Sequence, residues 1–273
     1  MQQPIGVIDS GVGGLTVSRE LMRQLPKEKL IYLGDTERCP YGPRSKEQVK
    51  RYTWQMVHYL LGKNIKLLIV ACNTATAYTL SELQSALLIP VIGVIEPGAR
   101  AAIKNSQNKQ IGVIGTEGTI NSKAYPNTLK GVDHKIQVDG LACPRFVPMI
   151  EDGVFKGEEA EAVVAQTLQP LKNKSNMDTL ILGCTHYPII KDLVQAEMGP
   201  HIQVISSGEE TAREASLILA YHKSLEQGNI APVHEFFTTG NIEKFRHIAN
   251  QWFEEPIQVL EWVSLDPMKS SAK

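Results

Sequence analysis

The sequence predicts an α/β protein built of two pseudo-symmetric α/β domains with mostly parallel sheets. Three observations support this fold class. Short apolar runs alternate with helical stretches, several of these runs lack any polar residue, and one pattern of strands occurs twice along the 273 residues. Continuous apolar runs are typical of parallel strands covered on both faces, and strand–helix alternation favours right-handed crossovers between parallel strands.

Eight short runs rich in β-branched and other apolar residues are expected to form the strands. In chain order they are residues 5–8, 30–33, 67–71, 91–95, 111–114, 136–138, 179–182 and 204–205. Ser45 and Gln48 form a capping box in front of an apolar-periodic segment that Gly62 ends, so a helix is expected between them. A second capping box is expected at residues 207–210, opening a helix that runs to about residue 224.

The C-terminal part of the chain is expected to add a helix around residues 242–253 and an apolar run over residues 257–263. No chemical role is predicted for this part. Its large aromatic residues are expected to serve packing or a subunit contact. They are Trp252, Phe253 and Trp262.

Two segments of the first half recur in the second half in the same order. Residues 5–9, IGVID, correspond to residues 111–115, IGVIG. Residues 68–72, LIVAC, correspond to residues 180–184, LILGC, so each copy of this second segment ends in a cysteine. The repeat predicts two related halves that each place a thiol just past the carboxyl end of a central strand.

The repeat and the elements around it predict a discontinuous domain organisation. Residues 1–96 and 210–273 are expected to form the first α/β domain, and residues 97–209 the second. The four cysteines are expected to be free thiols in a reducing compartment, because none of them forms a CxxC pair. They are Cys39, Cys72, Cys143 and Cys184.

Composition argues against several classes of protein. Hydrophobic residues make up 42% and charged residues 21% of the chain, which argues against disorder, collagen and coiled coil. The formal net charge of -1 gives no basic surface for nucleic acid. No apolar run approaches the roughly 20 residues of a membrane helix, and the N-terminus does not resemble a signal peptide. A cytoplasmic location without nucleic-acid or membrane partners is therefore expected.

A glycine-rich turn, residues 9–14 with the sequence DSGVGG, lies between an expected strand and an expected helix. Backbone N–H groups at such a helix start suit a carboxylate or a phosphate. The glycine spacing matches neither the GxGxxG dinucleotide fingerprint nor a GxxxxGK phosphate loop, so it does not favour a dinucleotide as the ligand. Asp9 either caps the following helix or lies beside a ligand, because ligands bind at the carboxyl ends of strands in open α/β sheets.

Two cysteines stand at matching points of the repeat. Cys72 precedes Asn73 and Thr74, and Cys184 stands two residues before His186. A thiol just before a helix is expected to have a lowered pKa and an accessible thiolate, with Asn73 and Thr74 as neighbouring donors. The alternative is that the cysteines are buried and inert and that His186 is a structural histidine.

If the two halves face each other, Cys72 and Cys184 approach a shared cleft from opposite sides, and this cleft between the domains is the expected active site. Inversion at a carbon stereocentre requires such opposed acid–base groups, because one thiolate removes a proton while the other thiol delivers one to the opposite face. A reversible disulfide or a metal pair is the competing use. Metal is disfavoured because the segments around the two cysteines supply too few ligands in a recurrent spacing.

Five segments together carry a resemblance to a known family. They are residues 5–17, 32–36, 40–42, 72–75 and 183–188. In this order they are similar to the bacterial glutamate racemases of the aspartate/glutamate racemase superfamily, and the resemblance extends from residue 5 to about residue 240. It implies an isomerase that interconverts L- and D-glutamate without a cofactor or a metal. It also implies a homodimer that supplies D-glutamate for peptidoglycan synthesis, and hence for cell wall biogenesis and cell shape.

The resemblance also implies roles for individual residues. Cys72 and Cys184 are the catalytic thiols, with Cys72 acting on the D-isomer and Cys184 on the L-isomer. Asp9 assists Cys72, and His186 assists Cys184. Glu151 is a further acidic helper, with an ordinary surface glutamate as the alternative. Substrate binding is assigned to Asp9, Ser10, Tyr41, Gly42, Asn73, Thr74, Thr185 and His186.

Three other functions stay open. An aspartate or hydantoin racemase, or a decarboxylase, of the same superfamily would keep the fold and the cysteines but change the substrate or the reaction. A non-catalytic binding protein would clasp a small acid between the two domains, with incidental cysteines. A redox protein would use Cys72 and Cys184 as a reversible disulfide.

Overall fold

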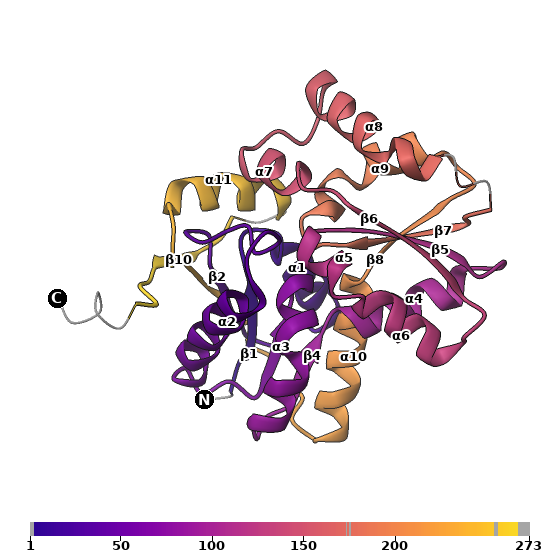
Figure 1. Ribbon diagram of the computed structural model, residues 1–273. Helices are drawn as coiled ribbons and strands as arrows, with labels where there is room; N and C mark the ends of the chain where they lie inside the picture. The colour runs from indigo at the N-terminus through magenta and orange to yellow at the C-terminus, as the bar shows by residue number, and fades with distance from the viewer. Residues whose placement is uncertain (1–2, 173, 175, 254–255, 267–273) are drawn as a thin grey trace.

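The computed structural model describes residues 3–172, 174, 176–253 and 256–266, which form two β-sheets with helices on both faces of each (Figure 1). Every strand pairing in this part of the chain is parallel. The predicted α/β class with two mostly parallel sheets is therefore confirmed.

The first sheet has the spatial strand order β10-β9-β2-β1-β3-β4, and the second has the order β6-β5-β7-β8. The strands of the first sheet are β1 (Ile5–Asp9), β2 (Leu30–Gly34), β3 (Leu67–Val70), β4 (Val91–Gly93), β9 (Glu235–Thr238) and β10 (Val259–Trp262). Those of the second sheet are β5 (Gln110–Gly115), β6 (Gln137–Ala142), β7 (Thr179–Gly183) and β8 (Gln203–Ser206).

All eight predicted strands are present, with shifted ends. β4 stops at Gly93 because Ile95 already begins the following helix, where a strand to residue 95 was expected. Strand β9 was not predicted, since Phe236 and Phe237 are its only apolar residues and give neither a run nor an alternation. It lies between β2 and β10, and β10 falls within the predicted apolar run.

The helices form one layer on each face of each sheet. They are α1 (Leu15–Gln24), α2 (Lys46–Leu61), α3 (Asn73–Ala86), α4 (Ile95–Asn105), α5 (Glu117–Asn121), α6 (Ala124–Val132), α7 (Phe146–Glu151), α8 (Glu158–Lys172), the 3₁₀ turn η1 (Tyr187–Ile190), α9 (Lys191–Met198), α10 (Gly208–Tyr221) and α11 (Ile242–Trp252). Apolar residues of α1, α10 and α11 share one core on the first sheet, and those of α2 and α3 share the other. On the second sheet, α7, α8 and α9 cover one face, and α4 and α6 cover the other.

One predicted capping box is confirmed and the other is wrong. Ser45 accepts a hydrogen bond from the backbone of Gln48, whose side chain returns one to Ser45, at the start of α2. Ser207 makes no such bond, because its backbone is already helical (φ -77°, ψ -15°) and its hydroxyl does not reach the third N–H group. Ser206 accepts a hydrogen bond from Gly208 N at 3.4 Å instead.

The parallel register aligns the carboxyl ends of the central strands. Asp9 at the end of β1 pairs with Gly34 at the end of β2, and Ile8 pairs with Val70 at the end of β3. In the second sheet Gly115 of β5 pairs with Gly183 of β7. The loops that follow these strands therefore lie together at one edge of each sheet.

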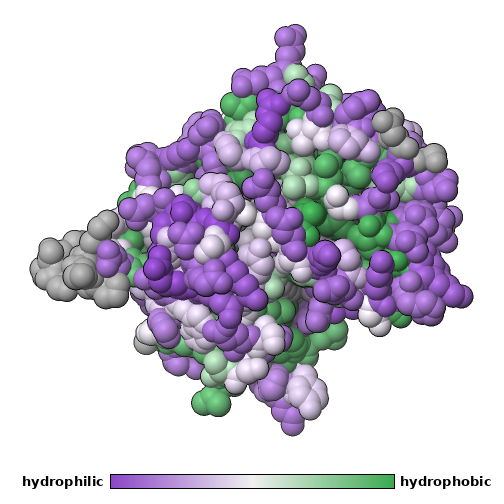
Figure 2. All heavy atoms as spheres, viewed as in Figure 1, coloured by the Kyte–Doolittle hydropathy of each residue, from purple (hydrophilic) through white to green (hydrophobic). Residues whose placement is uncertain are grey.

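The aromatic residues of the C-terminal part belong to the first sheet's surroundings. Phe253 is buried in the core under α1 and α11, with Trp252 packed against it. Trp262 is half-exposed and its indole N–H donates to Thr239 O at 2.8 Å. Hydrophilic side chains cover most of the face in Figure 2, with apolar patches, one of them over the second domain. None of the helices in the described ranges combines the length and apolar character needed to cross a bilayer.

The chain returns to the first sheet after the second has been formed, through α10, which packs on α1 and α4. We propose that residues 1–96 and 210–273 form one domain and residues 97–209 the other, which the division of strands between the sheets supports. A buried ion pair holds the segment after α10, through which the chain returns to the first sheet. Glu28, only 2% exposed, binds Lys66 Nζ at 2.6 Å and accepts from Glu226 N at 2.7 Å.

Replacing Glu28 with Gln should destabilise the protein by roughly 3–5 kcal/mol, because it leaves the buried Lys66 ammonium without its counter-charge. The change would be read from the free energy of unfolding in urea. Glu20→Gln is the control, since it removes an exposed ion pair with Arg23 and should cost far less. A Glu28→Gln protein as stable as the parent would contradict this account of the return segment.

Candidate active site

An enclosed cavity of about 10 Å³ lies between the two domains, at the carboxyl ends of their strands. Two larger hollows, of about 690 and 540 Å³, lie on the outer surface, and no cysteine lines them. The enclosed cavity is bordered by Ser10, Pro40, Tyr41, Gly42, Cys72, Asn73, Thr74, Thr116, Val147, Cys184, Thr185 and His186. The structure thus brings most of the predicted site residues to one place, with Asp9 and Glu151 directly behind them.

Each cysteine of the pair follows an equivalent strand in its own domain. Cys72 comes after β3 and caps α3, where its Sγ accepts a hydrogen bond from Ala75 N at 3.5 Å. Cys184 comes after β7, and both side chains are buried free thiols. The two thiols therefore border the same cavity from different domains.

The expected low pKa of the Cys72 thiol is wrong. Burial raises the pKa of Cys72 to about 12, and the carboxylate of Asp9 raises it further. The N–H group of Ala75 and the hydroxyl of Ser10 act in the opposite direction but are outweighed. The helix N-terminus alone does not compensate for removing a thiolate from water.

Asp9 joins the two domains rather than capping α1. Its Oδ1 accepts from Gly11 N at 2.9 Å, and its Oδ2 accepts from Thr185 Oγ1 of the second domain at 3.0 Å. The side chain is fully buried, and burial raises the pKa of Asp9, although the nearby His186 partly offsets this. Asp9 is therefore a better proton acceptor than an exposed aspartate.

A chain of polar contacts runs from Glu151 through His186 to Cys184. Nε2 of His186 lies 2.7 Å from Glu151 Oε1, and Nδ1 lies 3.8 Å from Cys184 Sγ. Burial lowers the pKa of His186, but hydrogen bonds to Cys184, Cys39 and Glu151 outweigh it and raise the pKa well above its ordinary value. Conversely, burial raises the pKa of Glu151, but His186 outweighs it and the net pKa is lowered. Each partner therefore favours the charged form of the other, and Nδ1 of His186 faces Cys184.

Glycine at position 13 is required by the approach of the second domain. A Cβ atom on Gly13 would lie 2.4 Å from His186 Nδ1 and 2.5 Å from Thr185 Oγ1, closer than real atoms come. The same turn donates Val12 N to Glu151 Oε1 at 3.1 Å. The glycine-rich turn thus serves close packing between the domains, and its backbone binds a side chain of the other domain.

Two polar residues beside the cavity were missed from the sequence. Thr116 Oγ1 lies 2.7 Å from Thr74 Oγ1, and the hydroxyl of Tyr125 donates to Asn73 Oδ1 at 2.8 Å. The repeat would have identified Thr116, because it follows the second copy as Ser10 follows the first. The sequence gives no signal for Tyr125, because the segment that forms α6 has the sequence of a solvent-exposed helix.

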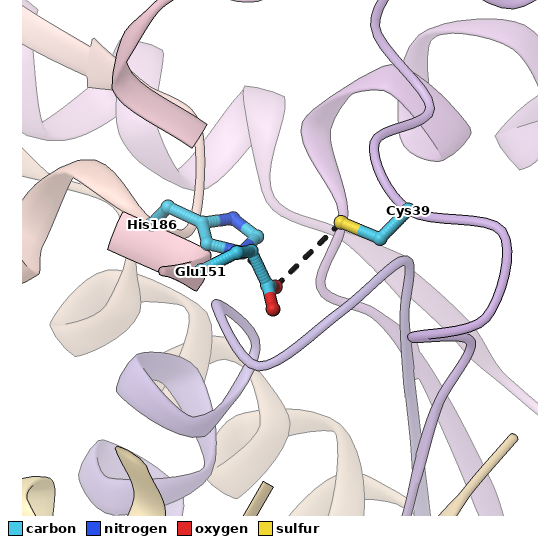
Figure 3. Close-up of side chains that lie close together, drawn as sticks. All are labelled: Cys39, Glu151 and His186. Carbon is cyan, nitrogen blue, oxygen red and sulfur yellow. Dashed lines mark hydrogen bonds and ion pairs between the residues drawn. The ribbon is translucent and has the colours of Figure 1, made fainter. Parts of the chain in front are cut away.

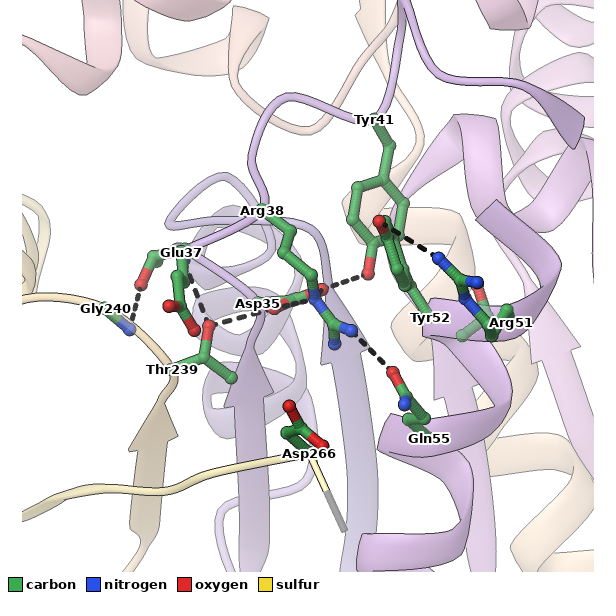
Figure 4. Close-up of polar contacts among 12 residues, drawn as sticks. Asp35, Glu37, Arg38, Tyr41, Arg51, Tyr52, Gln55, Thr239, Gly240 and Asp266 are labelled. Atoms are coloured by element: carbon green, nitrogen blue, oxygen red, sulfur yellow. Dashed lines mark hydrogen bonds and ion pairs between the residues drawn. The ribbon is translucent and has the colours of Figure 1, made fainter. Parts of the chain in front are cut away.

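The loop that carries Tyr41 and Gly42 is held by a buried carboxylate (Figure 4). Asp35 accepts hydrogen bonds from Arg38 Nε at 2.7 Å, from the hydroxyl of Tyr41 and from Thr239 Oγ1 at 2.9 Å. The guanidinium of Arg38 also lies 4.0 Å from the ring centre of Tyr52. Thr239 follows β9, so the C-terminal part of the chain has a role that the sequence did not reveal: it fixes this loop.

A family model described as Asp/Glu/Hydantoin racemase matches residues 5–215. The chain belongs to this family. It is therefore a racemase, an enzyme of the isomerase class, as the sequence resemblance predicts.

Full-length relatives of this racemase agree with the family. A protein of Oceanobacillus iheyensis named glutamate racemase is 62% identical over 255 residues, which cover 93% of each chain. The crystal structure of a glutamate racemase isoform from Bacillus anthracis has a TM-score of 0.92 at 49% identity, covering 96% of this chain and 98% of that one. The glutamate racemase of Francisella tularensis, solved with D-glutamate, has a TM-score of 0.89 at 37% identity, covering 97% and 98%. The predicted resemblance to glutamate racemases is confirmed.

Replacing Glu151 with Gln in this racemase should lower the pKa of His186, because the imidazolium loses the carboxylate at 2.7 Å. The measurement is a pH titration of the His186 ring nitrogens by NMR. In the parent, the raised pKa means that protonation of His186 stabilises the fold below the unfolded-state pKa of about 6.5, and this stabilisation is lost as pH rises through the folded-state pKa.

Glu151→Gln should reduce that pH dependence of stability. Glu158→Gln, on the exposed start of α8, is the control and should leave the titration of His186 unchanged. If His186 titrates at the same pH in the Glu151→Gln protein as in the parent, the carboxylate does not set its charge.

Proposed function

We propose that this racemase interconverts L- and D-glutamate, with Cys72 and Cys184 exchanging protons with Cα from opposite faces and no cofactor taking part. One observation carries the proposal: two buried thiols follow equivalent strands of the two domains and border one enclosed cavity. The names of the relatives, and the D-glutamate in one related crystal structure, support glutamate as the substrate.

In the proposed reaction the thiolate of one cysteine takes the proton from Cα, and the electron pair stays on Cα. The thiol of the other cysteine then delivers its proton to the opposite face, so the thiol and the thiolate exchange roles without a net change in protons. Cys72 takes the proton of D-glutamate, and Cys184 takes that of L-glutamate. The enzyme returns to its starting state when one proton moves between the Cys72 side and the Cys184 side of the cavity. It also returns when it racemises a molecule of the opposite enantiomer.

The neighbours of each thiol supply the means to form a thiolate. Asp9 accepts the proton from the Cys72 side, since burial raises its pKa. His186, held by Glu151, serves Cys184. The raised pKa of Cys72 opposes the thiolate at neutral pH, yet a thiolate formed there is a stronger base toward Cα than one in water.

An unpaired donor is available for the substrate carboxylate. Nδ2 of Asn73 is buried and has no hydrogen-bond partner among the described residues, whereas its Oδ1 accepts from Tyr125. The hydroxyls of Ser10, Thr74 and Thr185 border the same space. Such fixed donors stabilise the charge that spreads onto the carboxylate when Cα loses its proton.

We further infer that the enzyme works in the cytoplasm as a homodimer and supplies D-glutamate for peptidoglycan, and so for the cell wall and cell shape. The bacterial sources of the relatives support this role. Leu217 and Tyr221 of α10 are 66% and 84% exposed and offer apolar area for a second copy.

Incubation of L-glutamate with the pure protein should abolish the circular dichroism of the solution, and in heavy water both enantiomers formed should carry deuterium at Cα. Cys72→Ser and Cys184→Ser should each slow racemisation roughly 10²–10⁴-fold, because each removes one acid–base group. The same assay with aspartate in place of glutamate distinguishes a glutamate racemase from an aspartate racemase.

Cys143→Ser is the matched control, since Cys143 is buried but does not border the cavity, and it should racemise at the parental rate. Parental rates in both the Cys72→Ser and the Cys184→Ser proteins would exclude the two-thiol mechanism. If the circular dichroism signal disappears for aspartate but not for glutamate, glutamate is excluded as the substrate.

Tyr125→Phe should lower kcat/KM for glutamate roughly fivefold, because the loss of one hydrogen bond of about 1 kcal/mol frees the amide of Asn73 to rotate. Steady-state kinetics in both directions would measure it. Tyr78→Phe removes another hydroxyl that bonds across the domains, to Gly118 O at 3.0 Å, and should leave kcat/KM nearly unchanged. Equal losses in the two variants would mean that Tyr125 acts through general stability alone.

A further inference from the structure

Three metal-ligating side chains from separate parts of the chain converge beside the cavity (Figure 3). They are Cys39 from the loop after β2, Glu151 at the end of α7, and His186 after β7. One ligand atom from each lies within 4.8 Å of the others. The sequence argument against a metal considered only the segments around Cys72 and Cys184, so it could not detect this set.

The three ligand atoms pack closely around Gly11. A Cβ atom built on Gly11 would lie 2.4 Å from Glu151 Oε1, 2.9 Å from Cys39 Sγ and 3.3 Å from His186 Nε2. A side chain at this position would clash with the ligand atoms, so glycine is required for them to come together beside this turn. Figure 3 shows the carboxylate between the imidazole and the thiol.

We propose that Cys39, Glu151 and His186 form a binding site for a soft divalent cation of the zinc class, and that occupation of this site inhibits the racemase. A thiolate, an imidazole and a carboxylate are a typical zinc donor set, with water in the fourth position. This site lies beside the space between Cys72 and Cys184 and shares His186 with it.

The distances require only a small adjustment. Cys39 Sγ lies 3.6 Å from Glu151 Oε1, and His186 Nε2 lies 2.7 Å from it. Around a tetrahedral zinc the ligand atoms lie roughly 3.3–3.6 Å apart, given bonds of about 2.0–2.3 Å. The imidazole and the carboxylate thus separate by about 0.6–0.9 Å, and the Glu151 side chain, 16% exposed, is in contact with solvent.

Binding changes the charge of the His186 ring. The ion displaces the Sγ proton of Cys39 and the Nε2 proton of His186, and both protons pass to the buffer. His186 is then fixed on the metal, and Glu151 is removed from it as a hydrogen-bond partner. With its Nε2 bound to the metal, the His186 ring is no longer an imidazolium. Its Nδ1 atom, which faces Cys184, then no longer exchanges a proton with that thiol.

Zinc binding to the apo-protein is tested by competition with a chromophoric chelator, and cobalt(II) serves as the spectroscopic probe. The parent should bind one tight zinc and show a thiolate-to-cobalt charge-transfer band with four-coordinate d–d bands. Cys39→Ser should bind zinc at least about tenfold more weakly and lack the charge-transfer band. Glu151→Gln should also weaken zinc binding, which provides a second variant if Cys39→Ser folds poorly.

Cys72→Ser and Cys143→Ser are the matched controls, and both should keep the tight zinc and the charge-transfer band. Zinc binding as tight in Cys39→Ser as in the parent would overturn the proposal, and so would loss of the site in Cys72→Ser. The inhibition arm rests on the proposed function: zinc should inhibit racemisation by the parent at concentrations at least about tenfold lower than for Cys39→Ser.

The two proposals fail separately. A protein that binds zinc through Cys39 but does not racemise glutamate keeps the metal site and loses the proposed function. A protein that racemises glutamate while Cys39→Ser binds zinc like the parent keeps the function and loses the metal site.

Discussion

Hydrogen bonds across the domain interface hold the loop after β1 against the loop after β7. Thr185 donates to Asp9, and Glu151 accepts from the backbone of Val12, so each domain uses the other's polar groups. Without these contacts Cys72 and Cys184 would lie at the edges of two separate sheets and would not border one cavity. The cavity, its exclusion of water and the charges of its side chains all depend on this interface.

Exclusion of water explains the electrostatics of the site. The helix N-terminus favours the Cys72 thiolate, but burial and the Asp9 carboxylate outweigh it and raise the pKa of Cys72. On the other wall the balance is reversed for His186, because its hydrogen-bond partners outweigh burial and its pKa is raised. The pKa is therefore raised by burial at Cys72 and by hydrogen bonds at His186, although the two sides of the cavity derive from one repeated sequence pattern.

The sequence predicted the parts of the fold that depend on local pattern. The apolar runs located eight strands, and the repeat correctly placed Cys72 and Cys184 at equivalent strand ends. It could not locate β9, whose position beside β2 is set by tertiary pairing rather than by periodicity. Contacts between distant segments, such as Tyr125 with Asn73, also leave no mark in local sequence. The burial that raises the pKa of Cys72 likewise belongs to the assembled interface.

The strand order of the first sheet has a consequence for synthesis on the ribosome. One edge of β2 is covered only by β9, which is made some two hundred residues later, after the second sheet is complete. Until then β2 presents unpaired backbone groups that can template pairing with another chain. The contiguous second sheet is free to fold first, while the nascent amino-terminal strands await their partner and are open to chaperones in the interval.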